Sequence, residues 1–353
     1  MRILQVITLC ELGGAQAVVA NLSNYMCKDH EVIVAAGEGD GEMFELLDPS
    51  IKVERIPSLY RALSPKREFM AIREMRKLYK KYNPDIIHLH SSKAGMLGRV
   101  AFPRNKTVYT VHGFDSIRLA YRKFLPIEKM MQHMCSAIVG VSKYDERNLH
   151  AEGILNNVHV IYNGIYPPTP LDQDPFTDYR KKYKGVILSI ARLAPQKNHV
   201  LFCELAKRFP DYAFLWIGNN QEPDFDFPEN VYFLGNIQHA GSYIKYSDMF
   251  MLLSNYEGLP IVIIESLASG IPVVASNVGG ITELLDGEFG FALNNDVDEM
   301  ASYVEKVLSY SKEKREKVAL DARKKFNDEF TIDSMGSEYL ALYNEIHNKN
   351  KHR

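Results

Sequence analysis

Short apolar runs alternate with longer amphipathic segments along most of the chain. The runs are dominated by Val, Ile, Leu and Ala and predict buried strands, whereas apolar residues spaced three or four apart between them predict helices. This alternation implies parallel sheets that are covered by helices on both faces. The predicted strands are Ile3–Ile7, Val32–Ala36, Ile86–Leu89, Val108–Val111, Ile138–Val141, Val158–Ile161, Val186–Ile190, Ala213–Ile217, Val231–Leu234, Met249–Leu253, Val273–Ala275 and Phe291–Leu293.

The alternation is interrupted once, in a segment rich in Pro and Asp that begins at Asn163. Prolines at this density prevent a continuous helix or strand, and 353 residues are too many for one ordinary core. We therefore expect a doubly wound domain over residues 1–165, a linker over 166–184, a second doubly wound domain over 185–330, and a final segment 331–353 that crosses back onto the first domain. Helices are predicted near the end of the chain at Met300–Tyr310, Lys312–Asn327 and Ile332–Asn348.

Composition indicates a soluble globular protein, with 46% hydrophobic and 24% charged residues. No apolar run approaches the ~20 residues that span a bilayer, and the first residues read as a strand that enters a glycine loop rather than as a signal peptide. We therefore expect a cytoplasmic protein. The four cysteines have no C-x-x-C spacing and are expected to be free thiols: Cys10, Cys27, Cys135 and Cys203.

The net charge of -2 hides an uneven distribution. Residues 55–129 contain 17 Lys or Arg and only 5 Asp or Glu, with apolar residues interleaved. Such a surface can dock on anionic lipid headgroups, with about 1 kcal/mol from each basic residue; an ordinary solvated helix face is the alternative, and a nucleic-acid face lacks a recognised module. The basic residues are expected around two helices: Arg61, Lys66, Arg67, Arg73, Arg76, Lys77, Lys80 and Lys81 around the first, and Arg118, Arg122, Lys123 and Lys129 around the second.

Two carboxylates lie eight positions apart, at Glu257 and Glu265. The pattern predicts a loop from Ser254 to Pro260 and a helix over Ile261–Ser269, so that one carboxylate caps the helix start and the other lies about one turn inside. Unpaired amides near Gly258, Leu259 and Ile261 favour an anion such as a phosphorylated ligand. Glu265 could then accept two hydrogen bonds from a ribose diol. The alternative is a helix with an acidic first turn.

Two cations follow a predicted strand of the second domain, at Arg192 and Lys197. Arg192 could grip phosphate oxygens in a planar fork and Lys197 could add a mobile charge, so together they could hold a diphosphate. A structural role at the strand end is the alternative.

In the first domain, the paired glycines Gly13 and Gly14 follow the first strand and could let the backbone approach a ligand. His112 follows another strand and would lie at the mouth of the cleft between the domains, unless it serves only in packing. The G-x-G-x-x-G spacing of a dinucleotide site is absent.

Metal and hydrolytic sites find little support. His88 and His90 share one face of a predicted strand, but no third ligand is evident. Asp224 and Asp226 lie in a polar, proline-containing segment that is interpreted as a turn. Motifs of P-loop enzymes, serine hydrolases and thiol enzymes are missing, which excludes kinase, hydrolase and protease readings.

Taken together, these motifs resemble the retaining glycosyltransferases of family 4, which have the GT-B architecture of two Rossmann-like domains. The resemblance covers essentially the whole chain and depends on the order and separation of the motifs. They are Gly13-Gly14, Thr110-Val-His112-Gly113, Gly140-Val-Ser142, Tyr162-Asn-Gly-Ile165, Ala191-Arg192 with Lys197, the pair Glu257 and Glu265, and Asn277-Val-Gly-Gly280 with Glu283.

The resemblance implies a nucleotide-sugar donor, with UDP favoured, bound mainly by the second domain. It places Arg192 and Lys197 on the diphosphate, Glu265 on the ribose and Glu257 near the donor sugar, with His112 reaching that sugar. Charge on the leaving diphosphate would be stabilised without a metal ion or other cofactor. The complete expected donor site comprises Gly13, Gly14, Arg192, Lys197, Asn236, Ile237, Glu257, Gly258, Leu259, Pro260, Ile261 and Glu265.

The stretch from His90 to Arg99 is similar to one in members that build bacterial surface polysaccharides on lipid-linked acceptors. Together with the basic segments, it favours transfer of a hexose or N-acetylhexosamine to a lipid-linked saccharide on the inner face of the plasma membrane, in capsule, exopolysaccharide or O-antigen synthesis. Two alternatives remain open at this point. One is a UDP-sugar epimerase with the GT-B fold, and the other is a non-catalytic partner subunit that binds sugar nucleotides.

Overall fold

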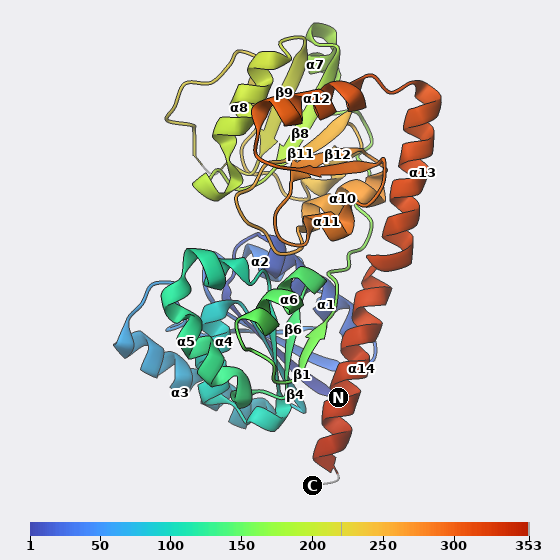
Figure 1. Ribbon diagram of the computed structural model, residues 1–353. Coiled ribbons are helices and arrows are strands. Elements are labelled where there is room, and N and C mark those ends of the chain that lie inside the picture. The colour runs from blue at the N-terminus through green and yellow to red at the C-terminus, as the bar shows by residue number, and fades with distance from the viewer. Residues whose placement is uncertain (220, 352–353) are drawn as a thin grey trace. The chain divides into compact units, whose positions relative to one another are not determined.

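The computed structural model describes residues 1–219 and 221–351, which form two compact units. The first unit contains Met1–Ile165 together with the chain from Ile332 onward, and the second contains Tyr166–Thr331. Each unit is built on a parallel sheet with helices packed against it (Figure 1). The predicted pair of doubly wound α/β domains is therefore confirmed.

The first unit has a seven-stranded sheet in the order β3-β2-β1-β4-β5-β6-β7, and every neighbouring pair is parallel. The edge strand β3 was not predicted, because its sequence Lys-Val-Glu-Arg is largely exposed and carries no apolar run. The strands are β1 (Arg2–Leu9), β2 (Glu31–Glu38), β3 (Lys52–Arg55), β4 (Ile86–His90), β5 (Thr107–Val111), β6 (Ala137–Gly140) and β7 (Val158–Val160).

Helices cover both faces of this sheet, and close packing on one face depends on two glycines of α4. A Cβ on Gly95 would lie 2.3 Å from the ring of Tyr109, and one on Gly98 would lie 2.5 Å from Leu89, so only glycine permits this approach. The helices of the first unit are α1 (Gly14–Met26), α2 (Glu42–Glu45), α3 (Pro65–Tyr82), α4 (Ser92–Ala101), α5 (Leu125–Met131), α6 (Lys143–Ala151) and α14 (Ile332–Lys351), with 3-10 turns at η1 (Arg104–Lys106) and η4 (Gln132–Met134).

The last helix, α14, covers the other face of the first sheet, although it follows the whole of the second unit in sequence (Figure 1). Its tyrosines reach polar groups on the strands: the hydroxyl of Tyr343 lies 2.6 Å from Nδ1 of His88, and that of Tyr339 lies 2.9 Å from Oγ1 of Thr110. Gly336 lies against the ring of Tyr25 in α1, where a side chain would collide. The predicted return of the final helix to the first domain is confirmed.

The second predicted basic helix is wrong in its form. The chain there makes three short pieces, namely the π-helix η2 (Ser116–Ala120), the 3-10 turn η3 (Arg122–Phe124) and α5. Pro126 lies in the first turn of α5, where a proline fits, but it would disrupt a helix that ran on through it. The first basic helix is found as predicted and is α3.

The second unit has a six-stranded parallel sheet in the order β10-β9-β8-β11-β12-β13. The strands are β8 (Gly185–Ile190), β9 (Tyr212–Ile217), β10 (Val231–Phe233), β11 (Met249–Leu252), β12 (Val273–Ser276) and β13 (Gly290–Leu293). The helices are α7 (Thr177–Lys182), α8 (His199–Arg208), α9 (Gly241–Ile244), α10 (Ile261–Ser269), α11 (Ile281–Leu284), α12 (Val297–Leu308) and α13 (Lys312–Glu329), with a 3-10 turn at η5 (Pro195–Lys197).

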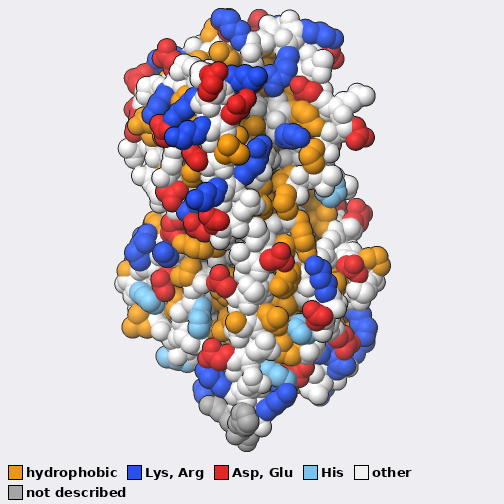
Figure 2. Space-filling model, turned by 90° about the vertical axis from the view of Figure 1, so that its right-hand side faces the viewer, with side chains coloured by type: hydrophobic (Ala, Val, Ile, Leu, Met, Phe, Trp, Pro, Cys, Tyr) orange, Lys and Arg blue, Asp and Glu red, His pale blue; other side chains and the backbone are white. Residues whose placement is uncertain are grey.

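Helix α10 begins and ends at the predicted residues, Ile261 and Ser269. It stops because Gly270 adopts a left-handed conformation with φ of 75°, and Pro272 follows. The short helix α7 lies inside the segment that was predicted to be a linker. On the surface seen in Figure 2, side chains of both charge signs intermingle over each unit.

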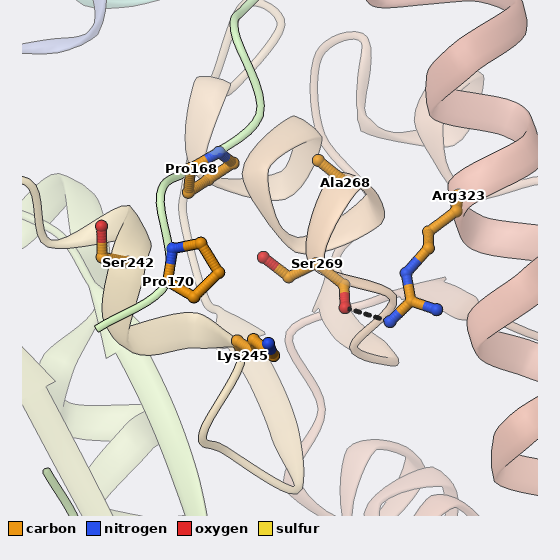
Figure 3. A pocket seen from close by; sticks show the side chains of 7 residues that line it. All are labelled: Pro168, Pro170, Ser242, Lys245, Ala268, Ser269 and Arg323. Atoms are coloured by element: carbon orange, nitrogen blue, oxygen red, sulfur yellow. Dashed lines mark hydrogen bonds between the residues drawn. The ribbon is translucent and has the colours of Figure 1, made fainter. Parts of the chain in front are cut away.

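A small pocket of the second unit holds the start of the chain that follows Ile165 (Figure 3). Pro168 and Pro170 line it beside the last turn of α10, and Nη2 of Arg323 donates to the carbonyl of Ser269 at 3.0 Å. The hydroxyl of Tyr246 donates to the carbonyl of Leu171. This pocket lies at the C-terminal end of α10, away from the helix start. We therefore interpret it as the place where the segment that contains Pro168 and Pro170 packs against the second unit.

None of the helices within residues 1–219 and 221–351 is both long and apolar enough to cross a bilayer. The four cysteines are free thiols, as predicted, and three of them are buried.

Candidate active site

The winding of the second sheet reverses between β8 and β11, which are neighbours in the sheet. In open parallel sheets such a reversal opens a crevice beyond the carboxyl ends of the two strands, and ligands bind there. Arg192 and Lys197 follow β8, and Glu257 follows β11. The structure therefore brings the predicted cations and the first predicted carboxylate to one edge of one sheet.

Lys197 and Glu257 form an ion pair at this edge, with Nζ of Lys197 on Oε1 of Glu257. Both side chains are mostly buried. The hydroxyl of Ser254 donates to the same carboxylate oxygen at 2.6 Å. The sequence had suggested that Glu257 caps α10, and this prediction is wrong. The cap residue is Pro260, without a capping side chain, because the carboxylate is held by Lys197 and Ser254 instead.

The loop that carries Glu257 is fixed by its neighbours. Gln196 donates to the carbonyl of Tyr256 at 2.9 Å and accepts from the amide of Asn255 at 2.8 Å, which joins this loop to the turn that carries Lys197. On the other side, a Cβ on Gly279 would lie 2.2 Å from the carbonyl oxygen of Glu257, and φ there is +61°. Only glycine fits at this position, which gives a physical reason for the glycine pair of the Asn277–Gly280 motif.

The N-terminus of α10 lies at the same edge, and of its first-turn amides that of Ile263 donates to the carbonyl of Pro260 at 3.2 Å. The first-turn amides of a helix lack intrahelical acceptors, and the helix dipole adds positive potential there. Ile261 and Leu259 are buried, Gly258 is half-buried, and Gly280 N–H donates to the carbonyl of Gly258 at 2.8 Å. A helix start next to a buried lysine is suited to an anionic group.

Glu265 lies one turn inside α10, as predicted. Its carboxylate abuts Gly241 at the start of α9, where a Cβ would lie 2.6 Å from the carboxyl carbon. In the described part of the chain it has no hydrogen-bonding partner, and burial raises the pKa of Glu265 to about 7. A carboxylate that is half-buried and has both oxygens available can accept a pair of hydroxyl donors.

Arg192 is exposed, and within residues 1–219 and 221–351 its guanidinium makes no hydrogen bond or ion pair. The backbone before it is well anchored, because Ala191 donates to the carbonyl of Ile217 and accepts from the indole of Trp216, at 2.9 and 2.8 Å. A free guanidinium on a rigid strand end is available to a ligand phosphate.

The loop that carries Asn236 and Ile237 of the expected donor site follows β10. Gly235 has φ of +81°, and its amide N–H donates a hydrogen bond to Oδ1 of Asn219 at 2.8 Å. The next two residues, Asn236 and Ile237, are exposed and half-buried, respectively. The structure thus leaves both of them accessible.

In the first unit, Gly13 and Gly14 lie exposed after β1, and α1 begins at Gly14. No heavy atom lies within 4 Å of the place where a Cβ on Gly14 would stand, so the backbone there is open to a ligand. The Oε1 atom of Gln16 would lie 2.7 Å from a Cβ on Gly13.

His112, directly after β5, belongs to a chain of polar side chains that the sequence did not reveal. Its Nε2 lies 2.9 Å from Nδ1 of His90, and Nε2 of His90 lies 2.7 Å from Oε1 of Gln5. Burial lowers the pKa of His112 to about 4 and lowers the pKa of His90 well below its usual value, so both rings are neutral near pH 7. Because an amide oxygen only accepts, His90 donates from Nε2 and accepts at Nδ1, and His112 keeps Nδ1 as an acceptor.

The residues considered as metal ligands from the sequence, His88 and His90 and the pair Asp224 and Asp226, do not come together in one group. His88 bonds to Tyr343 and to Thr110, both through hydrogen bonds of 2.6 Å, so its ring nitrogens are occupied. Across the described ranges, no group of three or more His, Cys, Asp and Glu side chains could hold a metal ion. Asp224 and Asp226 lie exposed in an irregular segment, in keeping with their interpretation as a turn.

Two family models match the chain in succession. Residues 12–167 match the model described as Glycosyltransferase Family 4, and residues 173–325 match Glycosyl transferases group 1. The chain belongs to glycosyltransferase family 4. The first matched segment of this glycosyltransferase corresponds to the first unit, which contains the hydrogen-bonded His90 and His112. The second corresponds to the second unit, which contains the Lys197–Glu257 pair.

Curated relatives of this glycosyltransferase come from bacterial polysaccharide synthesis. It is 29% identical over 318 residues to an Escherichia coli enzyme named UDP-Gal:alpha-D-GlcNAc-diphosphoundecaprenol alpha-1,3-galactosyltransferase, and the match covers 78% of this chain and 77% of the relative. It is 25% identical over 348 residues to the Escherichia coli O-antigen biosynthesis glycosyltransferase WbnH, with 96% and 97% covered.

Solved structures confirm the GT-B fold of this glycosyltransferase. The Anabaena protein HepE, crystallised with UDP-glucose, superposes with a TM-score of 0.80 at 19% identity, and the match covers 98% of this chain and 100% of that one. A Rickettsia africae glycosyltransferase superposes with a TM-score of 0.78 at 22% identity, with 98% of each chain covered. At these identities the likeness concerns the fold alone.

Proposed function

We propose that this glycosyltransferase transfers a hexose or N-acetylhexosamine from a UDP-sugar to a lipid-linked saccharide, with retention of the anomeric configuration, in the synthesis of a bacterial surface polysaccharide. The observation that carries the proposal is the cluster at one sheet edge of Lys197, Glu257, the start of α10 and, one turn further, the unpartnered Glu265. Cations, amides and an acceptor carboxylate in this order match the diphosphate and ribose of a sugar nucleotide.

Each group of the cluster has a proposed role. Lys197, Arg192 and the first-turn amides of α10 would bind the diphosphate, and Glu265 would accept hydrogen bonds from the ribose diol. Glu257 would bind the donor sugar through its second carboxylate oxygen, because Oε1 already receives Ser254 and Lys197. We further propose that His112 accepts a sugar hydroxyl at Nδ1, and that Asn236 and Ile237 lie beside the base.

In the proposed reaction, the acceptor hydroxyl attacks the anomeric carbon on the face from which the diphosphate departs. The new C–O bond forms as the bond from the anomeric carbon to the phosphate oxygen breaks, and the departing diphosphate takes the hydroxyl proton. Lys197, Arg192 and the start of α10 would stabilise the charge that develops on the diphosphate. Positive charge from these groups would replace a metal ion, so we propose that the reaction needs no metal.

The proposed acceptor site is at a membrane surface, and α3 with the segment 116–131 is the proposed contact. Phe69 on α3 and Met130 on α5 are 62% and 69% exposed, so both large apolar side chains are available to a lipid surface. Both acidic residues of α3 face partners of their own: Glu68 pairs with Lys93, and Glu74 bonds to Ser58. The acidic residues of α3 therefore do not neutralise its basic residues, among which Lys81 pairs with Glu54 of β3.

The names of two relatives support a lipid-linked acceptor. The Escherichia coli galactosyltransferase is named for a diphosphoundecaprenol acceptor. A Campylobacter jejuni relative, 24% identical with 99% of both chains covered, is named for a PP-undecaprenol acceptor. A glycosyl acceptor with such a lipid would require the enzyme to work at the membrane.

The test is a donor screen in which nucleotide release is measured for UDP-, GDP- and ADP-sugars, with and without bacterial lipid extract. We expect release from one UDP-sugar only when the lipid is present, an α-configured product if that donor is an α-UDP-sugar, and unchanged rates in EDTA. Nucleotide-sugar binding without release in any extract would favour an epimerase or a non-catalytic subunit. Loss of activity in EDTA that Mg²⁺ restores would contradict the metal-free mechanism.

A further inference from the structure

Three neighbouring strands of the second sheet end in polar residues that bond to one another. Ser254 follows β11, Ser276 ends β12, and Asn295 follows β13. The amide of Ser254 donates to Oγ of Ser276 at 2.9 Å, and the Ser276 hydroxyl donates to Oδ1 of Asn295 at 2.5 Å. Nδ2 of Asn295 returns to the carbonyl of Ser254 at 3.1 Å, which closes a ring of three hydrogen bonds.

The direction of each hydrogen bond in this ring is fixed by chemistry. An amide oxygen only accepts, so the single proton of the Ser276 hydroxyl goes to Asn295, and the Ser276 oxygen must accept from Ser254 N–H. Both backbone groups of Ser254 are thereby held by side chains from the two neighbouring strand ends. Ser254 and Ser276 are fully buried, which shields the hydrogen bond between them from competing water, whereas Asn295 lies exposed at the surface.

With its backbone fixed, Ser254 has its hydroxyl free to donate, and it donates to Oε1 of Glu257 at 2.6 Å. Lys197 bonds to the same oxygen. Within the residues that the structure describes, no partner contacts Oε2 of Glu257. The carboxylate is thus held by one oxygen and presents the other.

The two partners of Oε1 differ in what a ligand would do to them. A diphosphate would compete for the ammonium group of Lys197, which is a mobile point charge. Ser254 cannot be drawn away, because its backbone belongs to the ring. Without Ser254, a diphosphate that attracts Lys197 would leave Glu257 unrestrained at the moment when its position matters.

We propose that Ser254, held by Ser276 and Asn295, is a positioning residue that keeps the Glu257 carboxylate in place when the donor diphosphate engages Lys197. This inference rests on the proposed function of the Lys197–Glu257 pair. Ser254 touches no substrate; it acts through Glu257. Loss of its hydroxyl should therefore lower turnover more than it weakens binding of UDP, which lacks the sugar.

A double-mutant cycle tests the proposal. Ser254→Ala is expected to lower kcat about tenfold or more, because this is the change in rate that corresponds to the free energy of a hydrogen bond to a charged group. The affinity for UDP should change less than about threefold. In the Glu257→Gln background the same change should cost less than twofold, since the group through which Ser254 acts is already impaired.

Ser247→Ala is the matched control. Ser247 precedes β11 at its other end, is buried, and donates its hydroxyl to the carbonyl of Ile244 at 2.8 Å. Its loss should cost similar stability and leave kcat unchanged. The positioning role would be overturned if Ser254→Ala and Ser247→Ala lowered kcat equally. It would also be overturned if the effects of Ser254→Ala and Glu257→Gln on kcat were independent and simply multiplied in the double variant.

Crystal structures with UDP provide a readout that needs no activity. In the wild-type protein Glu257 should keep its contact with Ser254 while Lys197 turns to the diphosphate, and in Ser254→Ala the carboxylate should move away. An unmoved carboxylate in that variant would overturn the proposal even if no donor is ever found. Absence of release from every sugar nucleotide, with the carboxylate displaced as expected, would instead reject the proposed function alone.

Discussion

Nδ1 of His90 lies 2.9 Å from Nε2 of His112, and the far nitrogen of His90 lies 2.7 Å from the side-chain oxygen of Gln5. The two rings are stacked, with their centroids 5.2 Å apart. A histidine that is wholly buried in the sheet thus determines which nitrogen of His112 carries its proton. The orientation of His112 depends on residues of β1 and β4 that contact no ligand themselves.

We predict that His90→Phe lowers kcat about tenfold, because phenylalanine fills the space but leaves His112 without its acceptor. The unfolding free energy should also fall, by about 1–3 kcal/mol for the polar groups left unpaired. His88→Phe is the control: it removes hydrogen bonds to Tyr343 and Thr110 on the same sheet face but leaves the bond between His90 and His112. Steady-state kinetics and urea unfolding separate the two, and equal losses of kcat would contradict the prediction.

The stability of the protein should fall as the pH drops below about 6.5. Burial lowers the pKa values of His88, His90 and His112 in the folded state, so the unfolded chain binds more protons once the pH falls below the usual histidine value. The contribution of the neutral histidines to the free energy of unfolding is fully present above pH 6.5. For His112 it decreases as the pH falls from 6.5 to about 4, and each histidine loses up to about 1.4 kcal/mol per pH unit. Urea unfolding at pH 7.5, 6 and 5 measures this, and the slope should be shallower in His112→Asn. An unchanged slope would show that His112 does not contribute.

Glu265→Gln should stabilise the protein at high pH and weaken UDP binding. Burial raises the pKa of Glu265 to about 7, so the folded state binds the extra proton between about pH 4.5 and 7, and stability decreases as the pH rises through that window. The uncharged glutamine avoids this cost, so its advantage should appear at pH 8 and vanish near pH 4. UDP affinity should fall about tenfold, because the glutamine amide offers one acceptor oxygen to the ribose diol.

Glu338→Gln is the control for Glu265, since burial also raises the pKa of Glu338, which lies on α14. It should leave UDP affinity unchanged. Thermal unfolding and calorimetric titration with UDP measure both effects. UDP binding that is equally strong in Glu265→Gln and the wild type would remove Glu265 from the donor site.

Charge reversal on the basic segments should release the protein from anionic liposomes while UDP binding persists. The four residues to be changed to Glu are Arg73, Lys77, Arg122 and Lys123, all of them exposed. The matched control changes four exposed lysines of the second unit: Lys207, Lys312, Lys317 and Lys324. Sedimentation with vesicles of phosphatidylglycerol should show a loss of about tenfold or more for the first variant at 0.1 M salt, since each basic residue contributes about 1 kcal/mol. Equal loss in both variants would indicate attraction by net charge alone.

The fold could be predicted well, because strands that are buried on both faces appear as apolar runs. Edge strand β3 lacked that signal, and the second predicted basic helix is divided into η2, η3 and α5, with Pro126 in the first turn of α5. The residues after β8 and β11 could also be predicted as neighbours, since the ends of parallel strands meet at one edge.

The hydrogen bonds that hold the candidate site residues in place could not be predicted from the sequence. Ser254 and Ser276 look like ordinary residues at strand ends, and the partners of His88 are separated from it by 22 and 255 residues. Polar residues within apolar runs were the signal available, and Gln5, His88, His90 and Thr110 all show it. Which of them bond to one another depends on strand order and on α14, which no local pattern specifies.

The position of α14 has a consequence for the order of events during synthesis. The first unit receives its last helix only after residues 166–331 have been made, and at about 5–20 residues per second this takes roughly 10–30 s. Throughout that interval His88 and Thr110 lack Tyr343 and Tyr339, and the sheet face beneath α14 is uncovered. Hydrogen exchange on a chain that ends at Thr331 should show this face unprotected. The half of the enzyme that leaves the ribosome first is therefore the half that matures last.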